Sequence, residues 1–125
     1  MRNWKEANLQ SEIMRIIDKC GYENPTPIQR AALPLGLINR DVVGVAETGS
    51  GKTLAFVIPL VTWITSLPKL EREQDIDQGP YGLIMAPTRE LVLQIEEETR
   101  KFAQPLGIRF VTLPSRRRKR EYQYK

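Results

Sequence analysis

The sequence predicts an α/β fold in which a parallel β-sheet, truncated after about three strands, is flanked by helices. Three short apolar runs, residues 42–45, 82–86 and 108–113, have the length and composition of buried strands. Two longer segments with helical spacing of their apolar residues, 52–66 and 89–102, separate these runs. This alternation of strand and helix favours parallel strands joined by right-handed crossovers.

Composition excludes several classes of protein. The chain has 125 residues, enough for one domain with its own core. A single cysteine, Cys20, excludes an internal disulfide, and its place on an apolar helix stripe favours packing over reactivity. Without histidine or a cysteine cluster, no zinc site is expected. No apolar run has transmembrane length and the N-terminus is not typical of a signal peptide, so we expect neither a membrane partner nor secretion.

The positive charge is concentrated at the C-terminal end. The chain carries +4, but residues 116–125 hold six basic residues and one acidic residue, a charge of +5 that leaves −1 elsewhere. We divide the sequence into an N-terminal flank and helix (1–20), a domain (21–113) and a basic tail (114–125) that we expect to be disordered. The tail could be a nuclear localisation signal, a nonspecific site for nucleic-acid phosphates, or a solvated segment without function.

The first predicted helix follows a polar opening. Apolar residues recur at helical spacing from Leu9 to Cys20. Asn8 or Ser11 is suited to the N-cap, and Gly21 to the position just past the C-terminal end.

A second, shorter helix is predicted through Leu37. Thr26 is its expected N-cap and Gln29, three residues later, its capping-box partner. Pro27 suits the first helical position, whereas Pro34 predicts a bend or an interruption.

A glycine-rich turn between the first strand and the next helix has the pattern of a phosphate-binding loop, with alanine in place of the first glycine. It comprises Ala46, Glu47, Thr48, Gly49, Ser50, Gly51, Lys52 and Thr53. The glycines allow backbone N–H groups to point at an anion, and the helix start adds its dipole. Lys52 is suited to β- and γ-phosphates and Thr53 to Mg²⁺. The alternative is a turn that only joins two elements.

Further along, Pro59 predicts a kink in the helix 52–66. Residues 67–80 are rich in carboxylates, which we expect to be solvated because nothing rigid holds them together around a metal. Thr88 can cap the helix 89–102, and residues 104–107 read as a turn.

Two segments are expected to share one crevice. Residues 46–53 and 87–90 each follow a predicted strand directly. Ligands of parallel sheets bind outside the carboxyl ends of the strands, so both segments could face one ligand site.

These motifs together resemble the first RecA-like domain of a DEAD-box RNA helicase, in its N-terminal part, over about residues 3–112. The segments that carry the resemblance are Trp4, Gly21-Tyr22 with Pro25-Thr-Pro-Ile-Gln29, Ala46–Thr53 and Pro87-Thr-Arg-Glu-Leu91. More loosely, Asp77-Gln-Gly-Pro-Tyr81 and Gln94-Ile-Glu-Glu-Glu-Thr99 are similar to the pre-mRNA-splicing branch of this family.

The resemblance implies a role for each motif. In the Q motif, Gln29 would bond the adenine edge and Tyr22 would pack on its face, with Trp4 supporting that loop. Residues 46–53 would bind ATP with Mg²⁺, and Pro87, Thr88 and Arg89 would contact the RNA backbone. Gln29 could instead serve only as a capping residue, Tyr22 and Trp4 could only fill the core, and Arg89 with Glu90 could form a solvated turn.

The sequence departs from the family toward its C-terminal end. The family holds Mg²⁺ and orients water with an Asp-Glu-Ala-Asp run, which this chain lacks, as it lacks a Ser-Ala-Thr block and a second RecA-like domain. The family pattern stops near Leu113, through truncation, alternative splicing or a gene-model error. We therefore expect weak ATP binding without turnover, no complete catalytic set, and poor solubility from exposed sheet edges.

Four functions stay open at this point. The leading one is part of an ATP-dependent RNA helicase, a nucleotide hydrolase, that acts with spliceosomal proteins in the nucleus, or otherwise in the cytoplasm. The second is a non-catalytic remnant or inactive product that binds ATP or RNA. A small P-loop kinase or GTPase is disfavoured, since Gln29 and Tyr22 indicate adenine. The last is a scaffold that binds no nucleotide.

Overall fold

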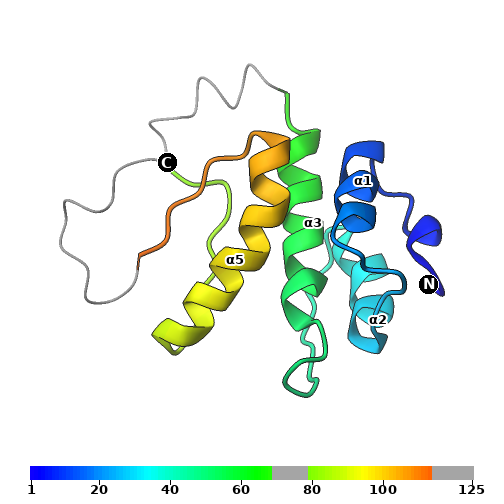
Figure 1. Cartoon of the computed structure of the whole chain (residues 1–125), viewed down its shortest axis with the longest axis horizontal. Helices are drawn as coiled ribbons and strands as arrows, with labels where there is room; N and C mark the ends of the chain where they lie inside the picture. Colours follow the sequence, from blue (N-terminus) through cyan, green and yellow to red (C-terminus); the bar gives the residue numbers. More distant parts are fainter. Residues whose placement is uncertain (69–78, 114–125) are drawn as a thin grey trace.

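The computed structural model describes residues 1–68 and 79–113 of the chain. Its elements are a 3₁₀-helix η1 (Trp4–Ala7) and the α-helices α1 (Ser11–Lys19), α2 (Pro27–Gly36), α3 (Lys52–Ser66) and α5 (Arg89–Leu106). Helix α3 stands between α5 on one side and α1 with α2 on the other (Figure 1). It contacts α2 and α5, and α1 also contacts α5.

The end of α1 sets the course of the chain into the following turn. Gly21 has a φ of +77°, a left-handed conformation that glycine adopts without steric cost. The Gly21 N–H donates to Asp18 O at 3.0 Å and the Tyr22 N–H donates to Ile17 O at 3.3 Å, the bonding pattern of a Schellman motif. The position predicted for Gly21 is confirmed.

The predicted N-cap of α1 is wrong. Gln10 occupies this position, without a side-chain capping bond, and Ser11 is the first helical residue. Asn8 instead ends η1, with a φ of +52°. Asparagine adopts this left-handed conformation more readily than most residues do, which suits it to the end of η1.

The observed bounds of α2 and α3 are close to the predicted ones. Helix α2 starts with Pro27 after Thr26 and continues through Pro34, and α3 runs through Pro59 from Lys52 to Ser66. The two helices are in close contact where Gly36 faces Pro59: a Cβ on this glycine would lie 2.8 Å from Pro59 Cγ.

Helix α5 is longer than predicted, because residues 104–106 are helical and do not form a turn. The helix continues through Pro105, although this residue has no N–H to donate to the carbonyl of Lys101. The helix ends at Gly107, with a φ of +68°, where the Ile108 N–H donates to Ala103 O at 2.9 Å. The stop signal is thus the glycine and not the proline.

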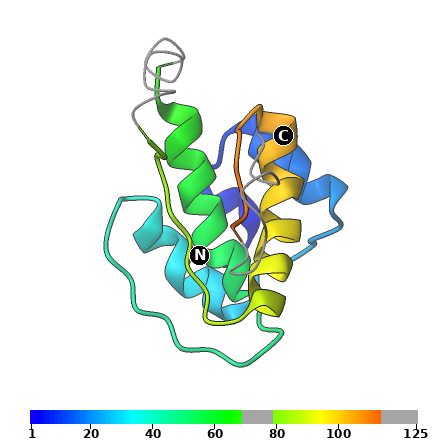
Figure 2. The ribbon, with the colours of Figure 1, turned by 90° about the vertical axis from the view of Figure 1, so that its left-hand side faces the viewer.

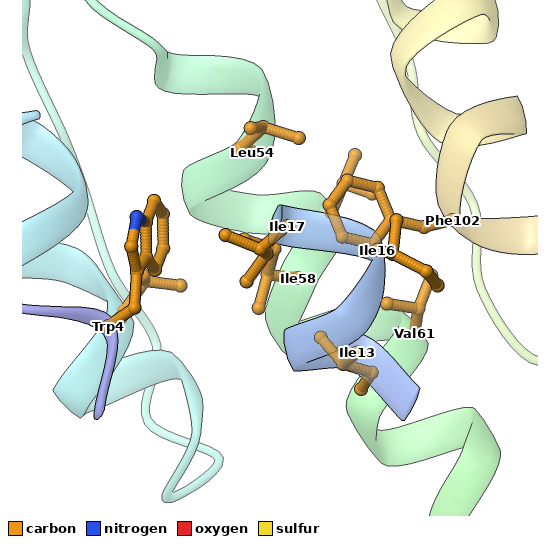
Figure 3. Packing of buried hydrophobic residues seen from close by; sticks show 10 residues of the cluster. Trp4, Ile13, Ile16, Ile17, Leu54, Ile58, Val61 and Phe102 are labelled. Carbon is orange, nitrogen blue, oxygen red and sulfur yellow. The ribbon is translucent and has the colours of Figure 1, made fainter. Parts of the chain in front are cut away.

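The core lies between η1, α1, α2, α3 and α5 (Figure 3). Its buried members are Trp4, Ile13, Ile16, Ile17, Leu33, Leu54, Val57, Ile58, Val61 and Phe102. Trp4, which the sequence places in a polar opening, is only 5% exposed. Cys20 is half-buried and packs against this cluster, in agreement with a packing role.

The three predicted strands are not assigned as strands in the described part of the chain. Residues 42–45, 82–86 and 108–113 form no regular secondary structure, and Figures 1 and 2 draw them as coloured tubes without arrows. Apolar composition favours extended backbone, but a strand also needs a paired neighbour, and no described backbone hydrogen bond joins these segments.

Two glycines bring these segments close to helices. A Cβ on Gly44 would lie 3.3 Å from Ile28 Cδ1 of α2, and one on Gly82 would lie 2.7 Å from Leu60 Cδ1 of α3. The neighbouring apolar side chains point outward, since Val43 is 96% and Met85 82% exposed. One face of this layer packs on the helices and the other is open.

Candidate nucleotide-binding site

The glycine-rich loop has the backbone conformation that an anion site requires. Gly49 and Gly51 have φ values of +79° and +83°, which an L side chain rarely adopts. The Ser50 N–H donates to Glu47 O at 3.2 Å and closes a turn that contains Gly49 and precedes Gly51. The loop leads directly into the first residue of α3, so its N–H groups and the helix dipole both favour an anion here.

Lys52 folds back over the loop. Its Nζ donates to Ala46 O, six residues earlier, and its side chain is exposed. This hydrogen bond places the ammonium group next to the first residue of the loop. Thr53 follows in the first helical turn, where a hydroxyl oxygen is a suitable ligand for a hard cation such as Mg²⁺.

Gln29 joins the second predicted motif to this loop. Its Oε1 accepts a hydrogen bond from the Thr26 N–H at 2.9 Å, and its Nε2 donates to Gly51 O at 3.0 Å. The side chain is only 3% exposed. A carboxamide has two N–H donors and two acceptor lone pairs, so one of each remains after these two bonds. The capping role expected for Gln29 is confirmed, and it leaves the amide able to bind a further group.

The contact between the two motifs is close. A Cβ on Gly51 would lie 2.5 Å from Gln29 Nε2 and 3.0 Å from Thr26 Oγ1. Since Gln29 meets Gly51 and Gly36 meets Pro59, α2 and α3 run in the same direction, with both N-terminal ends at the site. Two helix dipoles thus direct their positive ends toward one place.

One buried hydroxyl of the loop, Ser50 Oγ, lacks a hydrogen-bond partner. Buried polar atoms are normally satisfied, and a polar ligand at this loop would supply the missing bond. Together with the loop glycines, Lys52 and the two helix starts, this hydroxyl fits the phosphates of a magnesium nucleotide.

Tyr22 contacts α5 through its hydroxyl. The phenol donates to Glu98 Oε2 at 3.0 Å, and Lys101 Nζ donates to the phenolic oxygen at 3.3 Å and to Glu98 Oε1 at 3.0 Å. Burial, more than any neighbouring charge, raises the pKa of the Tyr22 phenol. The hydrogen bond to Glu98 is the largest cause that raises the pKa of Lys101 well above its usual range.

Trp4 lies in the core, so its packing role is observed and its support of the Q motif stays a prediction. The Glu98–Lys101 pair was missed in the sequence. Its signal was an acidic and a basic residue at i, i+3 spacing on a helix, which is common on solvated faces and does not indicate a tyrosine partner.

The residues predicted to contact RNA lie at the start of α5. Thr88 is the N-cap, and its Oγ1 accepts a hydrogen bond from the Leu91 N–H at 3.2 Å, which confirms the predicted cap. Pro87, Thr88 and Arg89 are all exposed. Helices α3 and α5 start at the same end of the molecule, the lower end in Figures 1 and 2. The phosphate loop and this segment thus occupy one end of the fold.

Some predictions fall outside the described residues, namely the basic tail at 114–125 and the acidic stretch within 69–78. Among residues 1–68 and 79–113, no group of three or more His, Cys, Asp or Glu side chains is arranged to hold a metal ion. The described helices include none that is long and apolar enough to span a bilayer.

Comparison with known proteins identifies the family. Residues 26–125 match the DEAD/DEAH box helicase family. The chain is 64% identical over 113 residues to the human probable ATP-dependent RNA helicase DDX23, which covers 90% of this chain and 14% of that protein. It is 58% identical over 113 residues to the pre-mRNA-splicing ATP-dependent RNA helicase PRP28 of Gibberella zeae, covering 90% of this chain and 16% of that protein.

A solved structure shares the fold. The RNA helicase Prp28 from Chaetomium thermophilum, crystallised with ADP, matches with a TM-score of 0.80 and 49% identity over 94% of this chain and 28% of that one. The described residues thus have the fold of part of a RecA-like DEAD-box helicase domain. The chain spans about one seventh of the length of the curated relatives that it matches. On the family match, the chain belongs to the DEAD/DEAH box helicase family.

Proposed function

We propose that this chain is part of an ATP-dependent RNA helicase that acts in pre-mRNA splicing, and that its residues 21–53 bind Mg-ATP. The observation that carries the proposal is the pair of hydrogen bonds by which Gln29 ties the Thr26 turn to Gly51 of the phosphate loop. The Gln29 amide, which can recognise a base, is thereby held beside the loop that can bind phosphates. The names of the relatives, which include ATP-dependent and pre-mRNA-splicing helicases, support this proposal.

Base recognition would use the part of the Gln29 amide that remains free. Adenine presents N7 as an acceptor and the N6 amino group as a donor on one edge, and a carboxamide pairs with both. Guanine presents two acceptors on the same edge, N7 and O6, which a carboxamide matches less well. Tyr22 would pack on the face of the base. We therefore expect the site to prefer ATP over GTP.

Phosphate binding would use the loop itself. The N–H groups of residues 47–52 would bind the phosphate oxygens, and Lys52 would move from Ala46 O to the β- and γ-phosphates. Thr53 would bind the Mg²⁺ that accompanies the nucleotide. Mg-ATP would supply the phosphoryl group whose hydrolysis drives a helicase, and this chain's contribution is to bind and orient it.

RNA would be contacted at the start of α5. An exposed helix N-terminus with the Thr88 hydroxyl and the Arg89 guanidinium favours a phosphate group and carries no base-specific readout. Splicing takes place in the nucleus, so the same proposal implies a nuclear location. The apolar segments 42–45, 82–86 and 108–113 would supply strands to the parallel sheet of a whole RecA-like domain.

A second candidate is a protein that binds nucleotide without hydrolysing it. The sequence contains no Asp-Glu-Ala-Asp run, so it lacks the carboxylates that hold Mg²⁺ and orient water in this family. ATPase measurements with and without RNA separate the two candidates. RNA-stimulated turnover by this chain would support the first, and binding without turnover would support the second.

Calorimetric titration of the 125-residue chain with Mg-ATP and Mg-GTP tests the proposal. We expect tighter binding of ATP than of GTP, and loss of both in Lys52→Ala. Lys19→Ala, which removes an exposed lysine at the end of α1, is the matched control and should bind as the unsubstituted chain does. Equal affinity for ATP and GTP would contradict base recognition, and binding that survives Lys52→Ala would contradict the phosphate site.

A further inference from the structure

A three-residue hydrogen-bonded cluster connects the turn after α1 to α5. Tyr22 donates to Glu98, and Lys101 donates to both Tyr22 and Glu98, at 3.0, 3.3 and 3.0 Å respectively. Tyr22 lies 76 residues from Glu98 and 79 from Lys101 in the sequence. We call these side chains the Tyr22 cluster. The cluster is therefore a tertiary contact, and the formation of α5 itself does not depend on it.

The cluster restrains the tyrosine ring through its hydroxyl. The hydroxyl is held by an acceptor and a donor, which fixes the end of the side chain. Lys101 Nζ lies 3.3 Å from the phenolic oxygen and 5.9 Å from the ring centroid, so the ammonium is beyond the hydroxyl end of the ring and not over a ring face.

Local backbone structure does not provide this restraint. Tyr22 closes the Schellman turn of α1, and three residues separate it from Thr26, where α2 is capped. Residues 22–26 belong to no helix. The position of the ring is therefore set by tertiary contacts, namely its packing against the core and the hydrogen bonds of its hydroxyl to α5.

We propose that Glu98 and Lys101 are positioning residues, which hold the Tyr22 ring where it packs on the base, so that α5 supports base recognition at a site built by α2 and α3. This inference rests on the proposed nucleotide site. It adds that two residues outside every motif of that site set its affinity for the base and leave its affinity for phosphate unchanged.

The test compares two probes on the same variants. Mg-ATP reports on base and phosphate together, whereas inorganic tripolyphosphate with Mg²⁺ reports on the phosphate loop alone. We expect Tyr22→Phe and Glu98→Ala each to weaken ATP binding about fivefold, the effect of one net hydrogen bond, and to leave tripolyphosphate binding unchanged. Glu97→Ala, on the exposed neighbouring position of α5, is the matched control and should change neither.

The outcomes distinguish this inference from the proposed function. If Lys52→Ala abolishes ATP binding but Tyr22→Phe and Glu98→Ala bind ATP normally, the nucleotide site stands and the positioning role is overturned. Equal loss of ATP and tripolyphosphate in Glu98→Ala would show general destabilisation and would also overturn it. Lys101→Met, which removes the ammonium and keeps an unbranched apolar side chain, provides a second test with the same expectation. A chain that binds neither probe would overturn both proposals.

Discussion

Gln29 is a buried polar side chain whose bonding explains its position. A buried amide without partners would cost about 1–3 kcal/mol, and Gln29 avoids this cost by bonding Thr26 and Gly51. The arrangement leaves one donor and one acceptor for a ligand. Gln29 can therefore cap α2 and bind a base at the same time. Its amide has enough donors and acceptors for both roles without a change of side-chain conformation.

Gly51 should be more sensitive to substitution than Gly49. Both have positive φ, so alanine costs about 1 kcal/mol at either position through backbone strain. At Gly51 the new Cβ would also displace Gln29, whose bonds contribute about 1 kcal/mol each, whereas nothing lies within 4 Å of a Cβ at Gly49. We expect Gly51→Ala to lose about 1–2 kcal/mol more unfolding free energy than Gly49→Ala in urea titrations. Equal losses would show that Gln29 moves away without cost.

The Tyr22 phenol should titrate above the ordinary tyrosine pKa of about 10. Because the folded-state pKa of the phenol is raised, as is that of Lys101, their stabilisation is complete below the unfolded-state values and is lost as the pH rises through the folded-state values. Phenolate absorbance, taken as the difference between the chain and Tyr22→Phe, measures this pKa. Glu98 raises it and Lys101 lowers it, so Glu98→Ala should shift it down and Lys101→Met should shift it up. Unchanged titration in both variants would contradict the cluster.

At the scale of elements, the helices could be predicted from the sequence because their signals are local. The apolar periodicity and the Gly51–Lys52 step located α3, and the Thr26–Gln29 spacing located the start of α2. The end of α5 was missed because residues 104–107 read as a turn, whereas the helix continues through Pro105 and ends at Gly107. The bonds from Gln29 to Gly51 and from Tyr22 to Glu98 join distant segments, so no local pattern indicates them.

The sheet illustrates a different limit of sequence patterns. Runs such as 82–86 predict extended, buried backbone, but whether such a run pairs depends on which neighbours are beside it. In the described residues these runs lie on the helices through Gly44 and Gly82 and are not paired with one another.

Thr88→Ala should weaken the start of α5. The threonine hydroxyl accepts a hydrogen bond from the Leu91 N–H, and loss of an N-cap typically costs about 1 kcal/mol. We expect faster hydrogen exchange of the Leu91 amide in this variant. Thr88→Ser retains the hydroxyl and is the matched control. If both variants exchange alike, the cap contributes nothing measurable.

At the scale of the whole molecule, the core and the open face differ in character. Within residues 1–68 and 79–113, η1, α1, α2, α3 and α5 bury one apolar cluster, while Val43, Val45, Leu83 and Met85 are between 78% and 96% exposed. Clustered apolar side chains in contact with water favour association. The stability of the chain and its solubility are thus determined by different parts of the molecule.

Polar substitutions on the open face should therefore reduce self-association. We expect Val43→Thr with Val45→Thr to shift sedimentation profiles toward the monomer, because these side chains are 96% and 92% exposed. The unfolding free energy should change by less than about 0.5 kcal/mol, as for other exposed positions. A chain that stays monomeric at every concentration before substitution would contradict this expectation.

The contact between Gly36 and Pro59 is a point about which α2 and α3 can rotate relative to each other. Gln29 and Gly36 are seven residues apart on α2, a lever arm of about 10 Å. If the angle between α2 and α3 changed by about 5° around this contact, the far end of that arm would move by about 0.9 Å. A Cβ at position 36 would act as a wedge, since it would lie 2.8 Å from Pro59 Cγ. Substitution of Gly36 would thus change the distance between Gln29 and the phosphate loop, although Gly36 itself is not part of the nucleotide site.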